Sequence, residues 1–241
     1  MSFNMNKSDR ILLECDNVSK QYGFFFALNK ISFNVKENTI LGIVGANGAG
    51  KTTLIKILSG LSSPTSGKIL INGMNYKDNN RDIKRLIGTI SSKSFLYDEL
   101  SIYENLKFYS KLYSVYEKHE FKEKIEQYAD RFNLSDWIYE PISYLSTGMR
   151  QKVEIIRILI HNPSILLLDE PFSGLDFNSI KLLIKILNNL RENENLTIIL
   201  TTHKIEVIQQ ICDATLILKR GKIKKYVPKT EMNKIKIESY F

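Results

Sequence analysis

A short apolar run followed by a glycine-rich loop and a helical pattern places the strongest constraint on the fold of this chain. Residues 39–44 (TILGIV) are apolar and are flanked by polar residues and glycine, which is typical of a buried parallel strand. GANGAGKT follows at residues 45–52, and the helical pattern LIKILSG then ends at Gly60. The sequence therefore predicts a strand, a glycine loop and a helix in succession, as in the core of an α/β fold.

This loop has the composition of a phosphate-binding site. It fits G-x-x-x-x-G-K-[ST], in which backbone N–H groups surround phosphate oxygens and the following helix directs its positive end at them. Lys51 is expected to reach the β- and γ-phosphates of ATP, and Thr52 to hold Mg²⁺ through its hydroxyl. The residues expected to bind the nucleotide here are Gly45, Asn47, Gly48, Gly50, Lys51, Thr52 and Thr53.

Two later apolar runs end in polar residues suited to the same chemistry. Residues 165–168 (ILLL) lead into Asp169 and Glu170, and residues 196–200 (LTIIL) lead into TTH. Open parallel sheets bind ligands at the carboxyl ends of their strands. We expect Asp169 to face Mg²⁺ as a metal ligand, and Glu170 to be the catalytic carboxylate directed at the attacking water.

Between the glycine loop and the apolar run at residues 165–168 the pattern becomes helical. Ser101 and Glu104 form a capping-box pattern. Apolar and aromatic residues then follow at steps of four and three, which indicates one amphipathic stripe that packs inward. Residues 91–158 are therefore interpreted as a helical lobe inserted into an α/β core of residues 1–90 and 159–225. The stripe comprises Ile102, Leu106, Tyr109, Tyr113 and Tyr116.

Composition and charge narrow the functional classes. The chain has 241 residues, 43% hydrophobic and 25% charged, as in ordinary globular proteins. Neither a membrane-spanning apolar stretch nor a signal-peptide core is present, so a cytoplasmic location is expected. Cys15 and Cys212 lie far apart without a CxxC pair, which favours two reduced, packed thiols over a zinc site or a disulfide framework.

The net charge is concentrated at one end of the chain. Residues 214–241 hold eight basic and two acidic residues, and so carry +6 of the formal net charge of +8. A nucleic-acid binder usually carries its basic residues as a stripe on the folded domain, so no nucleic-acid partner is expected. A basic tail over residues 222–241 could contact anionic lipid or a partner protein, but a solvated run of charges is the favoured interpretation.

Residues 145–152 (LSTGMRQK) resemble the LSGGQ signature of the ATP-binding-cassette family and stand upstream of ILLLDEP, as they do in that family. Tyr22 in SKQYGFFFAL matches the aromatic residue that stacks on adenine. The string SGLD, which ends at Asp176, matches the D-loop, and His203 matches the switch histidine. The chain is similar to this family over nearly its whole length.

The resemblance implies an α/β fold for residues 1–241: a P-loop, RecA-like core, an N-terminal antiparallel β-subdomain and the inserted helical subdomain. It implies hydrolysis of ATP to ADP and phosphate, with His203 at the γ-phosphate. Ser146, Gly148 and Asp176 would contact a nucleotide held by a second cassette, identical or different. The further partners implied are separate transmembrane permease subunits, with this chain attached peripherally to the cytoplasmic face of the membrane. FLYDELSIYENLKFYSKLY resembles ATPase subunits of prokaryotic export systems.

The sequence departs from the family pattern at two motifs. The signature has Thr147 and Met149 where glycine and glutamine are usual, which alters side-chain contacts but keeps Ser146 and Gly148. Ser92 aligns with the Q-loop glutamine that coordinates magnesium and senses the partner. Its side chain is too short to replace that glutamine directly. Two alternatives are that Ser92 is simply a loop residue, or that the alignment is shifted by one and Ser91 or Lys93 occupies the position.

Two alternatives remain open. A soluble cassette protein acting on ribosomes or nucleic acid would be expected to carry two cassettes or a long insert, and this chain has neither. A protein that binds ATP without hydrolysing it is disfavoured because Lys51, Asp169, Glu170 and His203 are all present.

Overall fold

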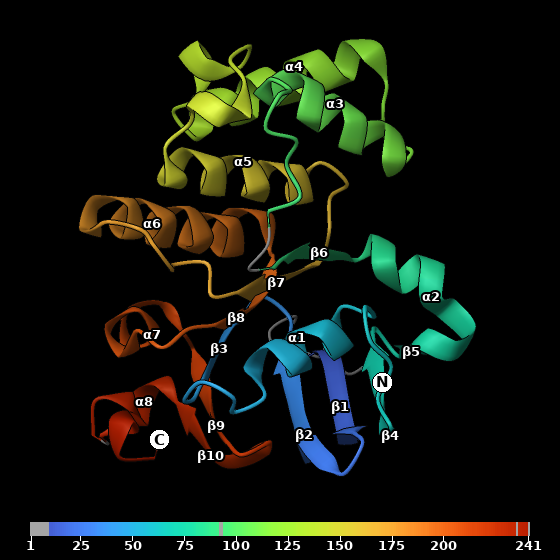
Figure 1. The fold of residues 1–241 in the computed structure, drawn as a ribbon, viewed down its shortest axis with the longest axis vertical. Coiled ribbons are helices and arrows are strands. Elements are labelled where there is room, and N and C mark those ends of the chain that lie inside the picture. Colours follow the sequence, from blue (N-terminus) through green and yellow to red (C-terminus); the bar gives the residue numbers. More distant parts are fainter. Residues whose placement is uncertain (1–9, 92–93, 235, 241) are drawn as a thin grey trace, which may run out of the picture.

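A six-stranded sheet forms the centre of the protein (Figure 1). The computed structural model describes residues 10–91, 94–234 and 236–240. Neighbouring strands of the central sheet are parallel, except that β10 runs antiparallel to β9. Their order is β10 (Lys222–Pro228), β9 (Ala214–Lys219), β3 (Ile40–Val44), β8 (Thr197–Thr201), β7 (Ile165–Asp169) and β6 (Ile87–Ile90).

Strands β3, β7 and β8 are buried along their whole length because both faces of this sheet are covered. Leu41 and Ile43 pack on one side with helix α1 (Lys51–Leu58) and the second sheet. Ile40 and Val44 pack on the other side, in the core shared by helices α5 (Thr147–Leu159), α6 (Phe177–Glu194) and α7 (Ile205–Ile211). The predicted succession of strand, glycine loop and helix is thus confirmed, and it lies between two apolar layers.

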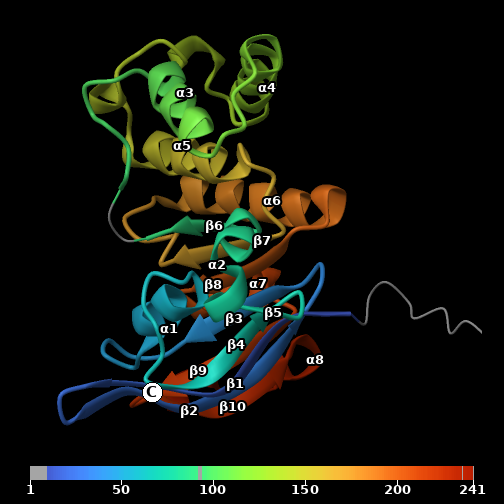
Figure 2. The ribbon, with the colours of Figure 1, turned by 90° about the vertical axis from the view of Figure 1, so that its right-hand side faces the viewer.

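A second, antiparallel sheet covers α1, as expected for the N-terminal β-subdomain (Figure 2). Alternate residues of its long strands, such as Leu13 and Cys15, point into the core. Both cysteines are free and buried, as predicted. The order of the sheet is β2 (Phe25–Lys36), β1 (Ile11–Tyr22), β4 (Ser66–Ile71) and β5 (Met74–Asn75).

Helices α3 (Ile102–Leu112), α4 (Lys118–Arg131) and α5 (Thr147–Leu159) form a separate helical region beyond β6 (Figures 1 and 2). The predicted capping box of Ser101 and Glu104 is present at the start of α3. The buried stripe is shorter than predicted, because α3 ends at Leu112 and the last two tyrosines of the pattern lie past it.

The remaining helices are α2 (Tyr76–Arg85), α6 (Phe177–Glu194), α7 (Ile205–Ile211) and α8 (Lys229–Met232). The basic stretch expected as a tail from residue 222 begins instead as strand β10, which pairs with β9 and leaves Lys222 and Lys224 exposed. The exposed Lys222 and Lys224 alternate with the partly buried Ile223 and Lys225, so a charge-rich string still forms an edge strand. Among the helices in the described residues, none has both the length and the apolarity to cross a bilayer.

Candidate functional site: a phosphate-binding loop beside two carboxylates

The loop between β3 and α1 has a backbone that glycine adopts without strain. Gly48 and Gly50 have φ angles of 78° and 108°, which L side chains rarely adopt. A Cβ on Gly45 would lie 2.3 Å from the Leu218 carbonyl oxygen, and one on Gly50 would lie 2.6 Å from that of Ala27. Close backbone packing therefore shapes the loop, which leads into the first turn of α1, where the N–H groups of a helix have no partner within the helix.

Lys51 places an ammonium group inside this loop. Its side chain is buried, and Nζ donates hydrogen bonds to the carbonyl oxygens of Gly45 (2.7 Å) and Ala46 (3.4 Å). The same Nζ lies 3.6 Å from Glu170 Oε1. The ammonium thus bridges the loop and the end of β7, while Thr52 beside it on α1 is exposed.

Asp169 and Glu170 are oriented by Thr201, which lies on the neighbouring strand β8. The buried Thr201 Oγ1 donates to Asp169 Oδ1 (2.7 Å) and accepts from the Glu170 backbone N–H (2.9 Å). Glu170 has a φ of 52°, which is uncommon for a residue other than glycine and turns the chain sharply off the strand. One hydroxyl therefore fixes both consecutive residues.

His203 follows the end of β8 and reaches the same carboxylate. Its Nδ1 lies 3.1 Å from Glu170 Oε2, and its side chain is 61% exposed. The structure therefore brings together four of the predicted residues. They are Lys51, Asp169, Glu170 and His203.

Tyr22 lies at the end of β1 with 52% of its surface exposed. Lys20 Nζ sits 5.1 Å from the centre of its ring, a cation–π contact. The ring is accessible for stacking. In the loop, Asn47 is exposed, and Thr53 on α1 is half-buried.

The residues of the signature and D-loop strings cap two adjacent helices. Ser146 caps α5 by accepting from the Met149 N–H, and Asp176 caps α6 by accepting from Asn178 and Ser179. The Ser179 N–H holds the pKa of Asp176 below its usual range. A Cβ on Gly148 would lie 2.8 Å from Ser179 Oγ, so the starts of α5 and α6 pack closely.

The signature residues do not join the loop within one chain. Helices α5 and α1 lie on opposite sides of strands β6 and β7 (Figures 1 and 2). Ser92, the residue at the Q-loop position, lies outside the described residues. From the sequence, Thr201 was predicted to follow a strand but was given no role, and Ser179 was not singled out. For Thr201 the available signal was its position, since it ends the strand adjacent to the one that ends in Asp169.

Known proteins match this chain over most of its length. A family model described as ABC transporter matches residues 28–173. The uncharacterised ABC transporter ATP-binding protein MJ1023 of Methanocaldococcus jannaschii is 39% identical over 214 residues, which cover 89% of this chain and 76% of MJ1023. The bacitracin transport ATP-binding protein BcrA of Bacillus licheniformis is 34% identical over 223 residues, 92% of this chain and 72% of BcrA.

A solved structure matches as well. It is the ATP-binding cassette MJ0796, a dimer in a post-hydrolysis state bound to ADP and Pi. It superimposes with a TM-score of 0.82 at 26% identity and covers 90% of this chain and 99% of its own.

Proposed function

The chain belongs to the ABC transporter family as an ATP-binding subunit that hydrolyses ATP, and from that premise we propose that residues 45–53 hold the phosphates while Tyr22 stacks on the adenine. The left-handed backbone of Gly48 and Gly50 supports this role, because it lets consecutive N–H groups converge on an anion. The accessible ring of Tyr22 supports the second role.

Mg²⁺ is assigned to Thr52 and Asp169. The Thr52 hydroxyl is exposed on the first turn of α1, and Thr201 orients the Asp169 carboxylate. Oxygen ligands of this kind suit Mg²⁺, which commonly takes one or two from the protein and the rest from phosphates and water. No group of three or more His, Cys, Asp or Glu able to hold a metal occurs in the described residues. When bound there, Mg²⁺ would neutralise charge on the β- and γ-phosphates.

Glu170 and His203 carry the catalytic step. Glu170 accepts a hydrogen bond from the attacking water and orients it, and His203 contacts the γ-phosphate. Lys51 Nζ lies 3.6 Å from Glu170 Oε1 and also contacts loop carbonyls. When Lys51 turns to the phosphates, Glu170 loses that counter-ion and is free to hold the water.

A second cassette completes the site. Ser146, Gly148 and Asp176 lie at the starts of α5 and α6, away from the loop of their own chain. Helix starts attract anions, so these residues would face the γ-phosphate held by the second subunit. The dimeric MJ0796 structure supports this arrangement.

Transmembrane permease subunits are the proposed partners, with the chain on the cytoplasmic face of the membrane. BcrA, named for bacitracin transport, supports a role in transport. Export is the proposed direction because residues 95–113 resemble ATPase subunits of export systems. In this proposal residues 1–90 and 159–225 form the motor core, and residues 91–158 form the lobe that carries the signature.

The proximity of Lys51 to Glu170, with Asp169 and Thr52 alongside, is the observation that carries this function. The test is phosphate release by the purified chain with MgATP, compared with ATP plus a chelator. Hydrolysis that requires Mg²⁺ supports the assignment, and hydrolysis at the same rate without it contradicts the metal site. Cell fractionation addresses the alternative: recovery with membranes supports a permease partner, and recovery with ribosomes would support a soluble regulator.

A further inference from the structure

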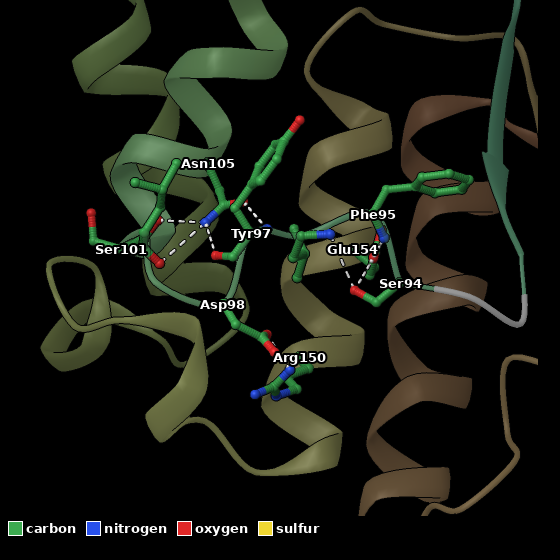
Figure 3. A network of polar contacts seen from close by, with 10 residues as sticks. Ser94, Phe95, Tyr97, Asp98, Ser101, Asn105, Arg150 and Glu154 are labelled. Carbon is green, nitrogen blue, oxygen red and sulfur yellow. Dashed lines mark hydrogen bonds and ion pairs between the residues drawn. The ribbon is translucent and has the colours of Figure 1, made fainter.

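A buried ion pair on α5 lies outside the ATP site and joins separate parts of the fold. Glu154 and Arg157 are only 5% and 4% exposed, and Arg157 Nε donates to Glu154 Oε2 at 2.7 Å. Glu154 Oε1 accepts from Ser94 Oγ at 2.7 Å and from the Phe95 backbone N–H at 2.9 Å (Figure 3). One carboxylate thus binds both its own helix and the segment that follows β6.

Arg157 extends these contacts to the central sheet. Its Nη2 donates to the carbonyl oxygen of Thr89 on β6 at 3.2 Å. Its guanidinium lies 5.6 Å from the centre of the Phe95 ring and 5.0 Å from that of Tyr109 on α3. From α5, the pair therefore contacts a core strand, the segment after it and helix α3.

The same segment has further attachments to the helical region (Figure 3). The buried Asn105 side chain accepts from the Tyr97 N–H at 2.8 Å and donates to the Tyr97 carbonyl at 3.0 Å. Arg150 on α5 binds Asp98 at 2.6 Å. Residues 94–98 are thus held to α3 and α5 at several points.

The energetics indicate a geometric rather than a stabilising role for the pair. Desolvation of two charges offsets much of their attraction, and apolar residues of similar size often stabilise a fold equally well or better. Apolar residues cannot form directional contacts. The hydrogen bonds that Ser94 and Phe95 donate to Glu154 have a preferred geometry and so hold both donors at fixed positions.

We propose that Glu154 is a positioning residue for ATP hydrolysis. It fixes residues 94–98 against α5 and so sets the orientation of Ser146 and Gly148, at the start of that helix, relative to the catalytic strands. Arg157 also joins α5 to Thr89 on β6, the strand whose last residue, Ile90, pairs with Leu168 directly before Asp169. This inference rests on the proposed function, because the orientation of α5 affects turnover only if its start contacts a nucleotide.

The decisive variant is the double substitution Glu154→Leu with Arg157→Met, which removes the pair without leaving a buried charge unpaired. We expect a thermal unfolding midpoint at or above that of the wild type and a dissociation constant for a fluorescent ATP analogue within twofold. We expect kcat at saturating MgATP to fall at least tenfold. A folded double variant with kcat within twofold of wild type would overturn the proposal.

Two controls separate positioning from general stability. Glu126→Ala removes an exposed glutamate of α4 that pairs with Lys122 at 3.8 Å, and should change nothing. Glu104→Ala removes the capping box of α3, and should lower the unfolding midpoint while leaving kcat of the folded protein unchanged.

If the double variant is insoluble, Glu154→Ala is compared with Glu104→Ala at equal folded concentration. A larger loss of kcat in Glu154→Ala supports the proposal, and equal kcat values overturn it. A wild-type chain without MgATP hydrolysis would contradict the proposed function itself, which distinguishes the two failures.

Discussion

The Thr201 hydroxyl donates a 2.7 Å hydrogen bond to Asp169 while accepting one from the Glu170 backbone. Strand β8 pairs with β7 in parallel and places these residues opposite each other at the carboxyl ends of both strands. One buried hydroxyl thus holds the Asp169 carboxylate and the Glu170 backbone in place.

Replacing Thr201 with valine keeps the shape but removes both hydrogen bonds. We expect kcat to fall about ten- to a hundredfold, or about 1.4–2.8 kcal/mol of transition-state stabilisation, because Asp169 and Glu170 lose their common anchor. ATPase assays at saturating MgATP measure this. The matched control is Thr215→Val on β9, another buried threonine, whose hydroxyl faces Met232 Sδ at 3.7 Å and lies outside the site. Equal kcat values for the two variants would contradict the role of Thr201.

Lys51→Ala removes the ammonium group from the phosphate loop. We expect ATP binding or turnover to be lost, because the β- and γ-phosphates lose their main side-chain cation. Binding of a fluorescent ATP analogue and phosphate release together measure this. Lys56→Ala on the same helix, at an exposed position, serves as the control. Wild-type turnover in Lys51→Ala would exclude the assigned site.

Glu170→Gln should separate binding from hydrolysis. The amide keeps the size of the side chain but cannot act as the carboxylate beside the water, so turnover should slow by orders of magnitude while ATP still binds. ATP then persists between two copies, and size-exclusion chromatography with ATP and Mg²⁺ should show dimers. A variant that stays monomeric at saturating MgATP contradicts a dimer that is stable without membrane partners.

Ser92→Ala tests the departure from the Q-loop pattern. A serine hydroxyl is too short to take the place of a glutamine amide at the metal, and a bridging water is the simpler arrangement. We expect Mg²⁺-dependent hydrolysis to change by less than about tenfold, or about 1.4 kcal/mol. A loss of a hundredfold with the fold intact would show that the hydroxyl acts directly at the metal.

The features that could be predicted best are those specified by a short run of consecutive residues. The phosphate-binding loop before Lys51 and the carboxylates of Asp169 and Glu170 could be predicted, because a few consecutive residues are enough to specify a glycine loop or the end of a strand. The hydrogen bond from Ser94 to Glu154 could not be predicted, since it depends on how α5 packs against a segment 60 residues earlier in the chain. Strand β10 was obscured because lysines dominate its composition, although every second residue from Ile223 to Val227 faces inward.

Acid should destabilise the fold partly through His161. Its ring stacks on Tyr113 at 4.2 Å, and its Nε2 lies 3.1 Å from the Ile87 carbonyl oxygen. Among the described residues no partner reaches its buried Nδ1. Burial lowers the pKa of His161 below the ordinary 6.5, and the nearby cations Arg157 and Lys124 act in the same direction, against the carbonyl of Ile87.

Because the pKa of His161 is lower in the folded state, the unfolded chain takes up the proton first as pH falls below 6.5. The free energy of unfolding should therefore decline from pH 7 toward pH 5, until the folded state also binds the proton. His161→Phe keeps the ring but cannot titrate, so its decline between these pH values should be smaller than that of wild type in urea titrations. His119→Phe, at an exposed position on α4, should keep the wild-type slope. Equal slopes for wild type and His161→Phe would show that this histidine does not contribute to the acid sensitivity.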